Sequence, residues 1–261
     1  MFFAADGPID ELPPSPGRRA ILTPIGVFVL VIVLCAGLLL VVRSIIEARG
    51  SAHRAVLAGR IATLGLGIYR HHETHGSMPA AYGTDRSGTP TSSWRLALLP
   101  SIEGDHIYNS YNLGWPWAAP ENSTAASTKL GLFVRPTRDY PRDSVNAELL
   151  VVVGRETAFP GPVGLRFDQI PDGTSNTILI VEAAESSIRW AEPRDLPFAG
   201  MDFRVNGPRK SRSIGSPYRC AEVLMADGSY RSLPNRTPPA TLRALLTIDG
   251  GEAIPGWDGV R

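Results

Sequence analysis

The sequence predicts an α+β fold of the type IV pilin-like kind, in which a long N-terminal helix packs on an antiparallel β-sheet and a short C-terminal helix follows. Three observations predict it. An apolar run lies near the N-terminus, a second helical pattern follows it directly, and strand-like runs are concentrated in the second half of the chain. Helices first and strands later is the order typical of α+β layers. The length of 261 residues and a hydrophobic content of 43% favour one large globular domain.

The first element is an apolar run at residues 20–42 that contains no charged side chain. At the helical rise it is long enough to cross a hydrocarbon core of about 30 Å. Cleaved signal peptides have a shorter apolar region and a small-residue cleavage site, whereas this run ends at Arg43. The sequence therefore predicts an N-terminal tail at 1–19, a retained transmembrane helix at 20–43 in contact with the lipid bilayer, and a globular domain at 44–261. The mature chain is then expected to begin at or near Met1.

The orientation of this anchor is left open by the charges beside it. Arg18 and Arg19 precede the apolar run, and four arginines follow it at positions 43, 49, 54 and 60. The count places the globular domain in the cytoplasm by the positive-inside rule. The rule is weak here, because large domains translocate largely regardless of their charge.

A second helical pattern begins after Gly50, and its apolar residues fall on one face: Leu57, Ile61, Leu64 and Ile68. Gly76 is a natural helix stop. Residues 78–93 and most of 115–145 are rich in turn formers and are expected to be loops. Between them a short helix is predicted at 94–99, with Pro100 ending it.

Short apolar runs at 149–153, 177–183, 221–225 and 229–233 predict β-strands. Asp227 and Gly228 separate the last two runs and predict a two-residue hairpin turn of type I′. The final element is expected to be a helix capped by Thr237, with Pro238 at its first position and a buried face formed by Leu242, Leu245 and Leu246.

Composition and motifs argue against several functions. The formal net charge is +1 and no basic block is present, so nucleic acid is not an expected partner. Ser175 and Ser229 lie outside any GxSxG elbow, and no histidine follows His106. Cys220 begins a strand-like run and has no nearby motif of an activated thiol. No phosphate or dinucleotide fingerprint occurs, so we expect neither an enzyme nor a cofactor.

Three possible binding sites each have a simpler structural explanation. His71 and His75 are spaced to offer two nitrogens to a metal ion on one helix face, but a solvated helix end explains them better. Asp-Gly pairs at 172, 227, 249 and 258 are explained by turn chemistry better than by calcium. The five tryptophans could form a sugar platform, although aromatic anchors under loops are more common. They are at positions 94, 115, 117, 190 and 257.

Several strings along residues 52–254 resemble the bacterial family called domain of unknown function 1559, whose members are pseudopilin-like with a prepilin-type N-terminus. The strings include SWRLALLPSIEGDHIYNSYNLGWPW, VVVGRETAFPG and AEVLMADGSYRSL. The residues that carry most of the resemblance are Asp172, Gly173, Thr174, Ser175, Asn176, Thr177, Trp190, Pro193, Asp227 and Gly228. We interpret all ten as structural. The resemblance implies a helix that is half in the membrane and half packed on a sheet outside the cytoplasm.

The chain departs from this family at two places. The stretch RRAILTPIGVFVLV lacks the glutamate that usually follows the processing site, and Pro217 replaces a common histidine. The prepilin-type processing motif is therefore degenerate. The expected function is a non-catalytic structural or protein-interaction role at the inner membrane, with unidentified envelope proteins as partners. The alternative is an exported glycan- or metal-binding module anchored to the membrane.

Overall fold

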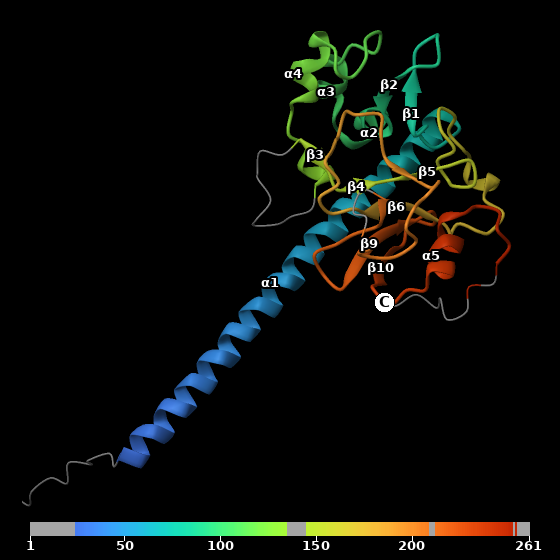
Figure 1. The fold of residues 1–261 in the computed structure, drawn as a ribbon. Helices are drawn as coiled ribbons and strands as arrows, with labels where there is room; N and C mark the ends of the chain where they lie inside the picture. Colours follow the sequence, from blue (N-terminus) through green and yellow to red (C-terminus); the bar gives the residue numbers. More distant parts are fainter. Residues whose placement is uncertain (1–23, 135–144, 209–211, 253, 255–261) are drawn as a thin grey trace, which may run out of the picture. The chain divides into compact units, whose positions relative to one another are not determined.

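A long N-terminal helix, antiparallel strands and a short C-terminal helix confirm the predicted α+β class (Figure 1). The structure is a computed structural model, and it describes residues 24–134, 145–208, 212–252 and 254. The chain divides into two compact units, Met1–Gly50 and Ser51–Arg261. Helix α1 (Pro24–His75) has residues in both units, and each unit is described by itself.

In the first unit, α1 is an apolar helix whose large side chains are exposed, among them Phe28, Ile32 and Leu39. Within the described residues, α1 is the one helix long and apolar enough to cross a membrane, by its length and composition. It overlaps the transmembrane segment predicted at 20–43. The predicted tail at 1–19 and the first residues of the segment, 20–23, lie outside the described residues.

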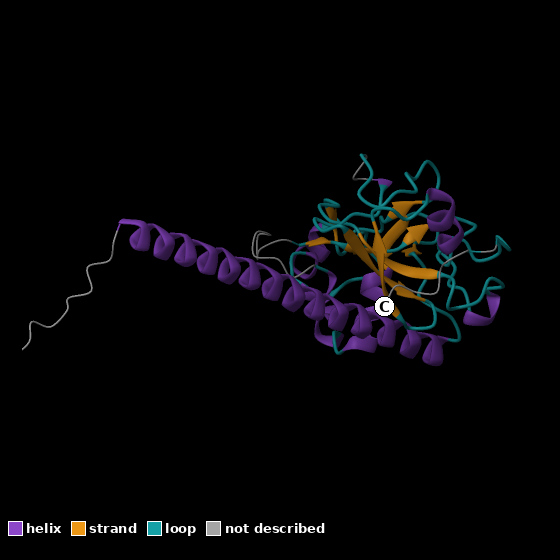
Figure 2. Ribbon diagram, turned by 90° about the horizontal axis from the view of Figure 1, so that it is seen from below, coloured by secondary structure: helices purple, strands orange, loops and turns teal. Residues whose placement is uncertain are grey.

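In the second unit, the predicted apolar face of α1 is buried. Leu57 is 2% exposed, and Ile61, Leu64 and Ile68 are each 0% exposed. The helix ends at His75, and Gly76 follows with φ of +76°, as expected for a glycine stop. Figure 2 shows this part of α1 running along the strands.

The central sheet has four strands in the order β10-β9-β6-β4, and all neighbouring pairs are antiparallel. Its strands are β4 (Leu149–Leu150), β6 (Ile178–Glu182), β9 (Cys220–Met225) and β10 (Tyr230–Pro234). Every residue of β6 is buried, because the sheet is covered on both sides. The predicted strands at 177–183, 221–225 and 229–233 are thus confirmed.

Two expectations about strands are wrong. Residues 78–93 were expected to be a loop, but β1 (Tyr82–Thr84) pairs antiparallel with β2 (Pro90–Ser93). The run 149–153 was expected to be one strand, but it divides at Val151. Its second half, β5 (Val152–Val153), pairs in parallel with β8 (Leu196–Pro197). The remaining pair is β3 (Asn146–Ala147) with β7 (Ile188–Arg189).

Pro100 does not end the helical segment that starts at Trp94. Helix α2 (Trp94–Leu98) continues as the 3₁₀ helix η1 (Leu99–Ile102), because proline is tolerated in a first turn, where its missing N–H has no helical partner. Among the described residues, five further short helices were not predicted. They are α3 (Asp105–Ser110), η2 (Pro120–Asn122), α4 (Ser123–Ala126), η3 (Gly131–Phe133) and η4 (Phe167–Gln169). Of these, η2, α4 and η3 interrupt the loop expected at 115–145. Residues 135–144 lie outside the described residues.

The last helix, α5 (Pro239–Leu246), buries Leu242, Leu245 and Leu246 as predicted. Its predicted cap is wrong. The cap residue is Pro238, and the Thr237 hydroxyl donates instead to the carbonyl oxygen of Pro234 at 2.7 Å. The threonine therefore closes the turn after β10 and makes no contact with the helix amides.

Candidate functional site: a groove lined by the motif residues

The β9–β10 turn contains three residues, Ala226, Asp227 and Gly228, so the predicted two-residue type I′ turn is wrong. Gly228 N donates to the carbonyl oxygen of Met225 at 3.0 Å, and Met225 N donates to that of Ser229 at 2.9 Å. Gly228 has φ of +82°, whereas Asp227 is not among the residues with positive φ. This is the pattern of a type I turn followed by a left-handed bulge residue. Only the glycine needs conformational freedom here.

The Asp172 to Thr177 loop is held in place by its own polar groups. The Asp172 carboxylate accepts from Gly250 N at 2.8 Å and from Gly251 N at 2.9 Å. Asn176 Nδ2 donates to the carbonyl oxygen of Asp172 at 3.1 Å, and Gly173 has φ of +88°. The carboxylate is hydrogen-bonded to two backbone amides, so it holds the segment after α5 against this loop.

The same loop is joined to the hairpin turn by backbone hydrogen bonds. Asp227 N donates to the carbonyl oxygen of Thr174 at 3.0 Å, and Ala226 N donates to that of Thr177 at 2.8 Å. Two motifs about fifty residues apart in the chain, by their residue numbers, thus form one rigid corner of the domain. The structure brings them together, and Ser175 is exposed on its outer side.

A groove of about 500 Å³ lies between this corner and α1. Leu66 and Tyr69 form its helical side and are 51% and 52% exposed. The helix approaches the sheet closely at Gly65, where an added Cβ would lie 3.1 Å from Leu224 Cδ1. The complete lining is Gly65, Leu66, Tyr69, Phe167, Thr174, Leu179, Leu224, Met225, Ala226, Asp227 and Gly228.

One wall of the groove is aromatic, and its rim carries one carboxylate. The Tyr69 and Phe167 rings stack with centroids 6.1 Å apart, and His72 lies 4.8 Å from the Phe167 ring. Asp227 is exposed, and its Oδ1 accepts from Ser229 N at 2.8 Å. Among the described residues, Asp227 forms no ion pair. The groove therefore combines an apolar floor with an uncompensated negative charge.

Trp190 and Pro193 belong to a second corner, around β7 and β8, that is also structural. Trp190 is 1% exposed, and its Nε1 donates to the carbonyl oxygen of Thr128 at 2.8 Å. Ser93 Oγ donates to the carbonyl oxygen of Trp190 at 2.7 Å. These bonds connect the segment to the loop after α4 and to the start of α2.

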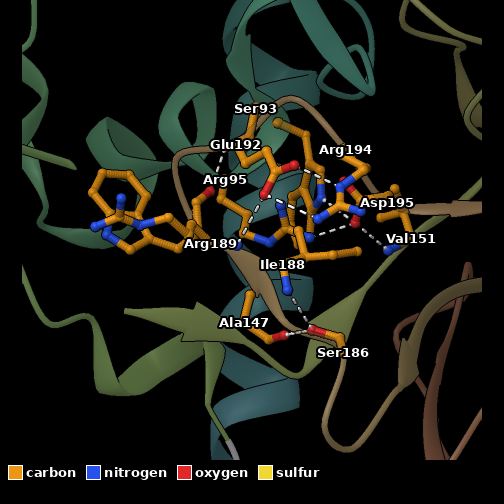
Figure 3. Close-up of polar contacts among 12 residues, drawn as sticks. Ser93, Arg95, Ala147, Val151, Ser186, Ile188, Arg189, Glu192, Arg194 and Asp195 are labelled. Atoms are coloured by element: carbon orange, nitrogen blue, oxygen red, sulfur yellow. Dashed lines mark hydrogen bonds and ion pairs between the residues drawn. The ribbon is translucent and has the colours of Figure 1, made fainter. Parts of the chain in front are cut away.

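Next to this corner, Arg95 and Asp195 form a fully buried ion pair (Figure 3). Asp195 Oδ1 accepts from Arg95 Nη2, from Val151 N at 3.0 Å and from Trp94 Nε1 at 3.3 Å. The bond to Val151 N lies at the point where the 149–153 run divides into two strands. Burial raises the pKa of Asp195 to about 6, against the opposing effect of Arg95. Burial also lowers the pKa of Arg95.

The metal candidates His71 and His75 stack face to face, with ring centroids 4.1 Å apart and an interplanar angle of 15°. Imidazole binds a metal in the plane of its ring, so two stacked rings do not direct their nitrogens at one ion. His71 Nδ1 lies 3.0 Å from the carbonyl oxygen of Ser77, and burial lowers the pKa of His71. Within the described residues, no group of three potential ligands gathers around a common point.

The tryptophans do not form one platform. Trp94 is 0% exposed and packs against Phe133, whereas Trp115 is 49% exposed and Trp117 is half-buried. Trp257 lies outside the described residues. The buried positions of Trp94 and Trp190 indicate that both side chains pack in the core.

The Cys220 thiol lies 3.7 Å from Glu222 Oε1, and burial raises the pKa of this thiol. An activated thiol has a lowered pKa, so Cys220 is not activated.

Sequence reasoning missed the groove and the Arg95–Asp195 pair. The partners of the pair are a hundred residues apart, and nothing in their local sequence distinguishes them from surface charges. It also missed Asn122, whose side chain binds the backbone of Asn112, Trp115 and Pro116 and holds the loop that exposes Trp115. The one available signal was the resemblance itself, since motif residues line the groove.

The fold and the site define a class of protein. Its members have an N-terminal helix of membrane-spanning length, followed in the chain by an α+β domain with an open apolar groove. The sequence model of the family described as "Protein of unknown function (DUF1559)" matches residues 47–162. This match confirms the predicted resemblance over that part of the chain. The motif residues from Asp172 onward lie beyond the matched range. Comparison with curated proteins and with solved structures found no match.

Proposed function

We propose that this protein is a membrane-anchored, non-catalytic envelope protein of pseudopilin-like architecture that binds protein partners. The observation that carries the proposal is the groove beside α1, where Leu66 and Tyr69 leave half of their surfaces in solvent. Exposed apolar side chains around a concave surface are typical of interaction sites. Trp115 and Leu113, on the loop held by Asn122, add a second exposed apolar feature.

The anchoring part of the proposal rests on α1 and on the family resemblance. Its first half is apolar and exposed, which is unfavourable in water and favourable in lipid. The resemblance favours an inner-membrane location with the globular domain outside the cytoplasm. We therefore expect the partners to be other envelope proteins.

A non-catalytic role is supported by the surroundings of the possible nucleophiles. Ser175 is exposed, Ser229 lies on the hairpin beside Asp227, and Cys220 lies beside Glu222. Among the described residues, none of the three forms a hydrogen bond to a histidine. Nucleophilic catalysis needs such a base within hydrogen-bond reach.

The test is photo-crosslinking in whole cells. A benzophenone amino acid replaces Leu66 in one strain and Val163 in another, because both side chains are exposed and only Leu66 lines the groove. We expect a discrete protein adduct from position 66 and none from position 163. The same amino acid is also placed at Tyr69 and Trp115, which are exposed as well. The proposal is wrong if positions 66, 69 and 115 all yield no protein adduct.

A further inference from the structure

We infer that the groove binds a peptide segment that carries a large apolar side chain next to lysine or arginine. The inference rests on the proposed interaction function and names the chemistry of its partner. It follows from three properties of the groove: its apolar lining, its negative rim and its rigidity.

The apolar lining sets the first requirement. Leu66, Leu179, Leu224 and Met225 surround a volume of about 500 Å³. That volume is within the range of pockets that hold small ligands, and it exceeds the volume of a single large side chain. Burying a leucine, methionine or phenylalanine side chain contributes roughly 1.5–3 kcal/mol. A polar segment would forfeit this contribution and leave the groove's own apolar surface in water.

The charge at the rim sets the second requirement. Asp227 uses one carboxylate oxygen to accept from Ser229 N. Asp168, next to the groove-lining Phe167, is already paired with Arg166 at 2.8 Å. Asp227 is the acidic residue of the groove lining, and among the described residues it forms no ion pair. A basic side chain would complement it, and an acidic side chain would be repelled.

The rigidity of the site makes the pairing selective. The Asp227 turn is tied to the Asp172 to Thr177 loop by two backbone hydrogen bonds, and that loop is tied to Gly250 and Gly251. The helical side is fixed by the close contact of Gly65 with Leu224. Because the rim carboxylate is held in position before binding, little ordering cost remains when the partner arrives.

The experiment is a selection with random twelve-residue peptides displayed on phage, using the full chain in lipid nanodiscs. The comparison chain is Leu66→Lys, which removes an apolar wall and adds a positive charge at an exposed helix position. We expect the peptides enriched on the original chain over Leu66→Lys to combine a large apolar residue with lysine or arginine within two positions. Raising the salt concentration should weaken their binding.

The matched variants for the best selected peptide are Asp227→Asn and Glu121→Gln. Asparagine keeps the acceptor for Ser229 N, so Asp227→Asn should leave the melting temperature unchanged while weakening the peptide about three- to tenfold. Glu121 is exposed and does not line the groove, so Glu121→Gln should not weaken it.

The inference is overturned if no peptide is enriched over Leu66→Lys, as expected of a groove that holds lipid. It is also overturned if the enriched peptides lack basic residues or bind Asp227→Asn equally well. With either result, a protein adduct from the crosslinking residue at position 66 in cells would still support the proposed interaction function. Absence of protein adducts from positions 66, 69 and 115 would remove both.

Discussion

The buried pair of Arg95 and Asp195 shows how a charge inside the domain depends on its partner. Removing one member of such a pair costs about 3–5 kcal/mol, because the other charge stays buried and uncompensated. We expect Arg95→Met to destabilise the full chain by this amount in urea unfolding near pH 8. The double variant, Arg95→Met with Asp195→Asn, should be more stable than the single variant Arg95→Met, since asparagine still accepts from Val151 N.

The pH dependence of the Arg95→Met variant provides a control. The pKa of Asp195 is already raised to about 6, and loss of Arg95 raises it further. Acidification then protonates the carboxyl group in the folded chain, so the penalty of Arg95→Met should be smaller near pH 5 than near pH 8. An equal penalty at both pH values would contradict the assignment of the cost to a buried carboxylate.

The buried His71 predicts a second pH effect on stability, in which acidification destabilises the folded chain. Burial lowers the pKa of His71, with smaller opposing and additional effects from the Ser77 carbonyl, His75 and His72. The folded state thus binds the proton less tightly than the unfolded state, whose histidine pKa is about 6.5. Its contribution to stability is complete above that pH and is lost as the pH falls below it.

We expect the titration of His71 to lower the melting temperature of the detergent-solubilised chain between about pH 7.5 and pH 5. His71→Asn should flatten this dependence, because the amide keeps a donor for the Ser77 carbonyl and does not titrate. The control is His106→Asn, at an exposed position on α3, which should leave the slope unchanged. If both variants keep the slope of the original chain, another group controls it.

At the scale of elements, two glycines of α1 make opposite predictions for the same substitution. A Cβ at Gly67 would lie 2.5 Å from Ile102 Cγ2, whereas nothing lies within 4 Å of one at Gly59. Gly67→Ala should therefore cost about 1–3 kcal/mol through overpacking against η1. Gly59→Ala should instead stabilise the chain by up to about 1 kcal/mol, through helix propensity. Thermal melts of the two variants should shift in opposite directions, and equal shifts would refute the packing of α1 on η1.

The β9–β10 hairpin is an element whose turn chemistry can be separated from its charge. Gly228 has φ of +82° with open space around it, so Gly228→Val should cost about 1–2 kcal/mol through backbone strain alone. Asp227→Asn should be nearly neutral. The measurement is the melting temperature with and without calcium. If calcium raised the melting temperature of the original chain and Asp227→Asn alone abolished that rise, Asp227 would be a metal ligand and its structural role in the turn would be disproved.

At the scale of the whole molecule, the proposed anchor predicts how the chain partitions between membrane and water. We expect the full chain to stay in the membrane pellet after an alkaline carbonate wash. Val33→Arg together with Leu34→Arg should release it, because each arginine at a helix centre costs about 2.5–3.5 kcal/mol. The paired alanine variant is the control and should remain in the pellet. Release of the original chain would show that α1 does not span.

The proposed orientation has a separate test in the whole cell. Protease added to spheroplasts should remove the globular domain if it lies outside the cytoplasm. Complete protection in intact spheroplasts, with digestion after lysis, would reverse the orientation. The charges beside the apolar run leave both outcomes open, and the family resemblance favours the first.

The sequence by itself determined the features that depend on local pattern. The period of Leu57, Ile61, Leu64 and Ile68 identified the buried face of α1, and a β-branched run identified β6. The Asp-Gly step between two strand-like runs identified β9 and β10. Helical and strand periodicities report burial directly, because a side chain on the wrong face would lie in water. The uncharged run similarly identified the candidate membrane span.

Only the tertiary structure decided what depends on distant partners. The division of 149–153 at Val151 follows from the Asp195 carboxylate, 44 residues away. The turn of β9–β10 has three residues because its register is set by strand pairing, which a dipeptide signal does not specify. The groove exists because the Asp227 turn, the Asp172 loop and Tyr69 meet in space. Long-range contacts are selected by packing of the whole domain, and short sequence windows do not contain that information.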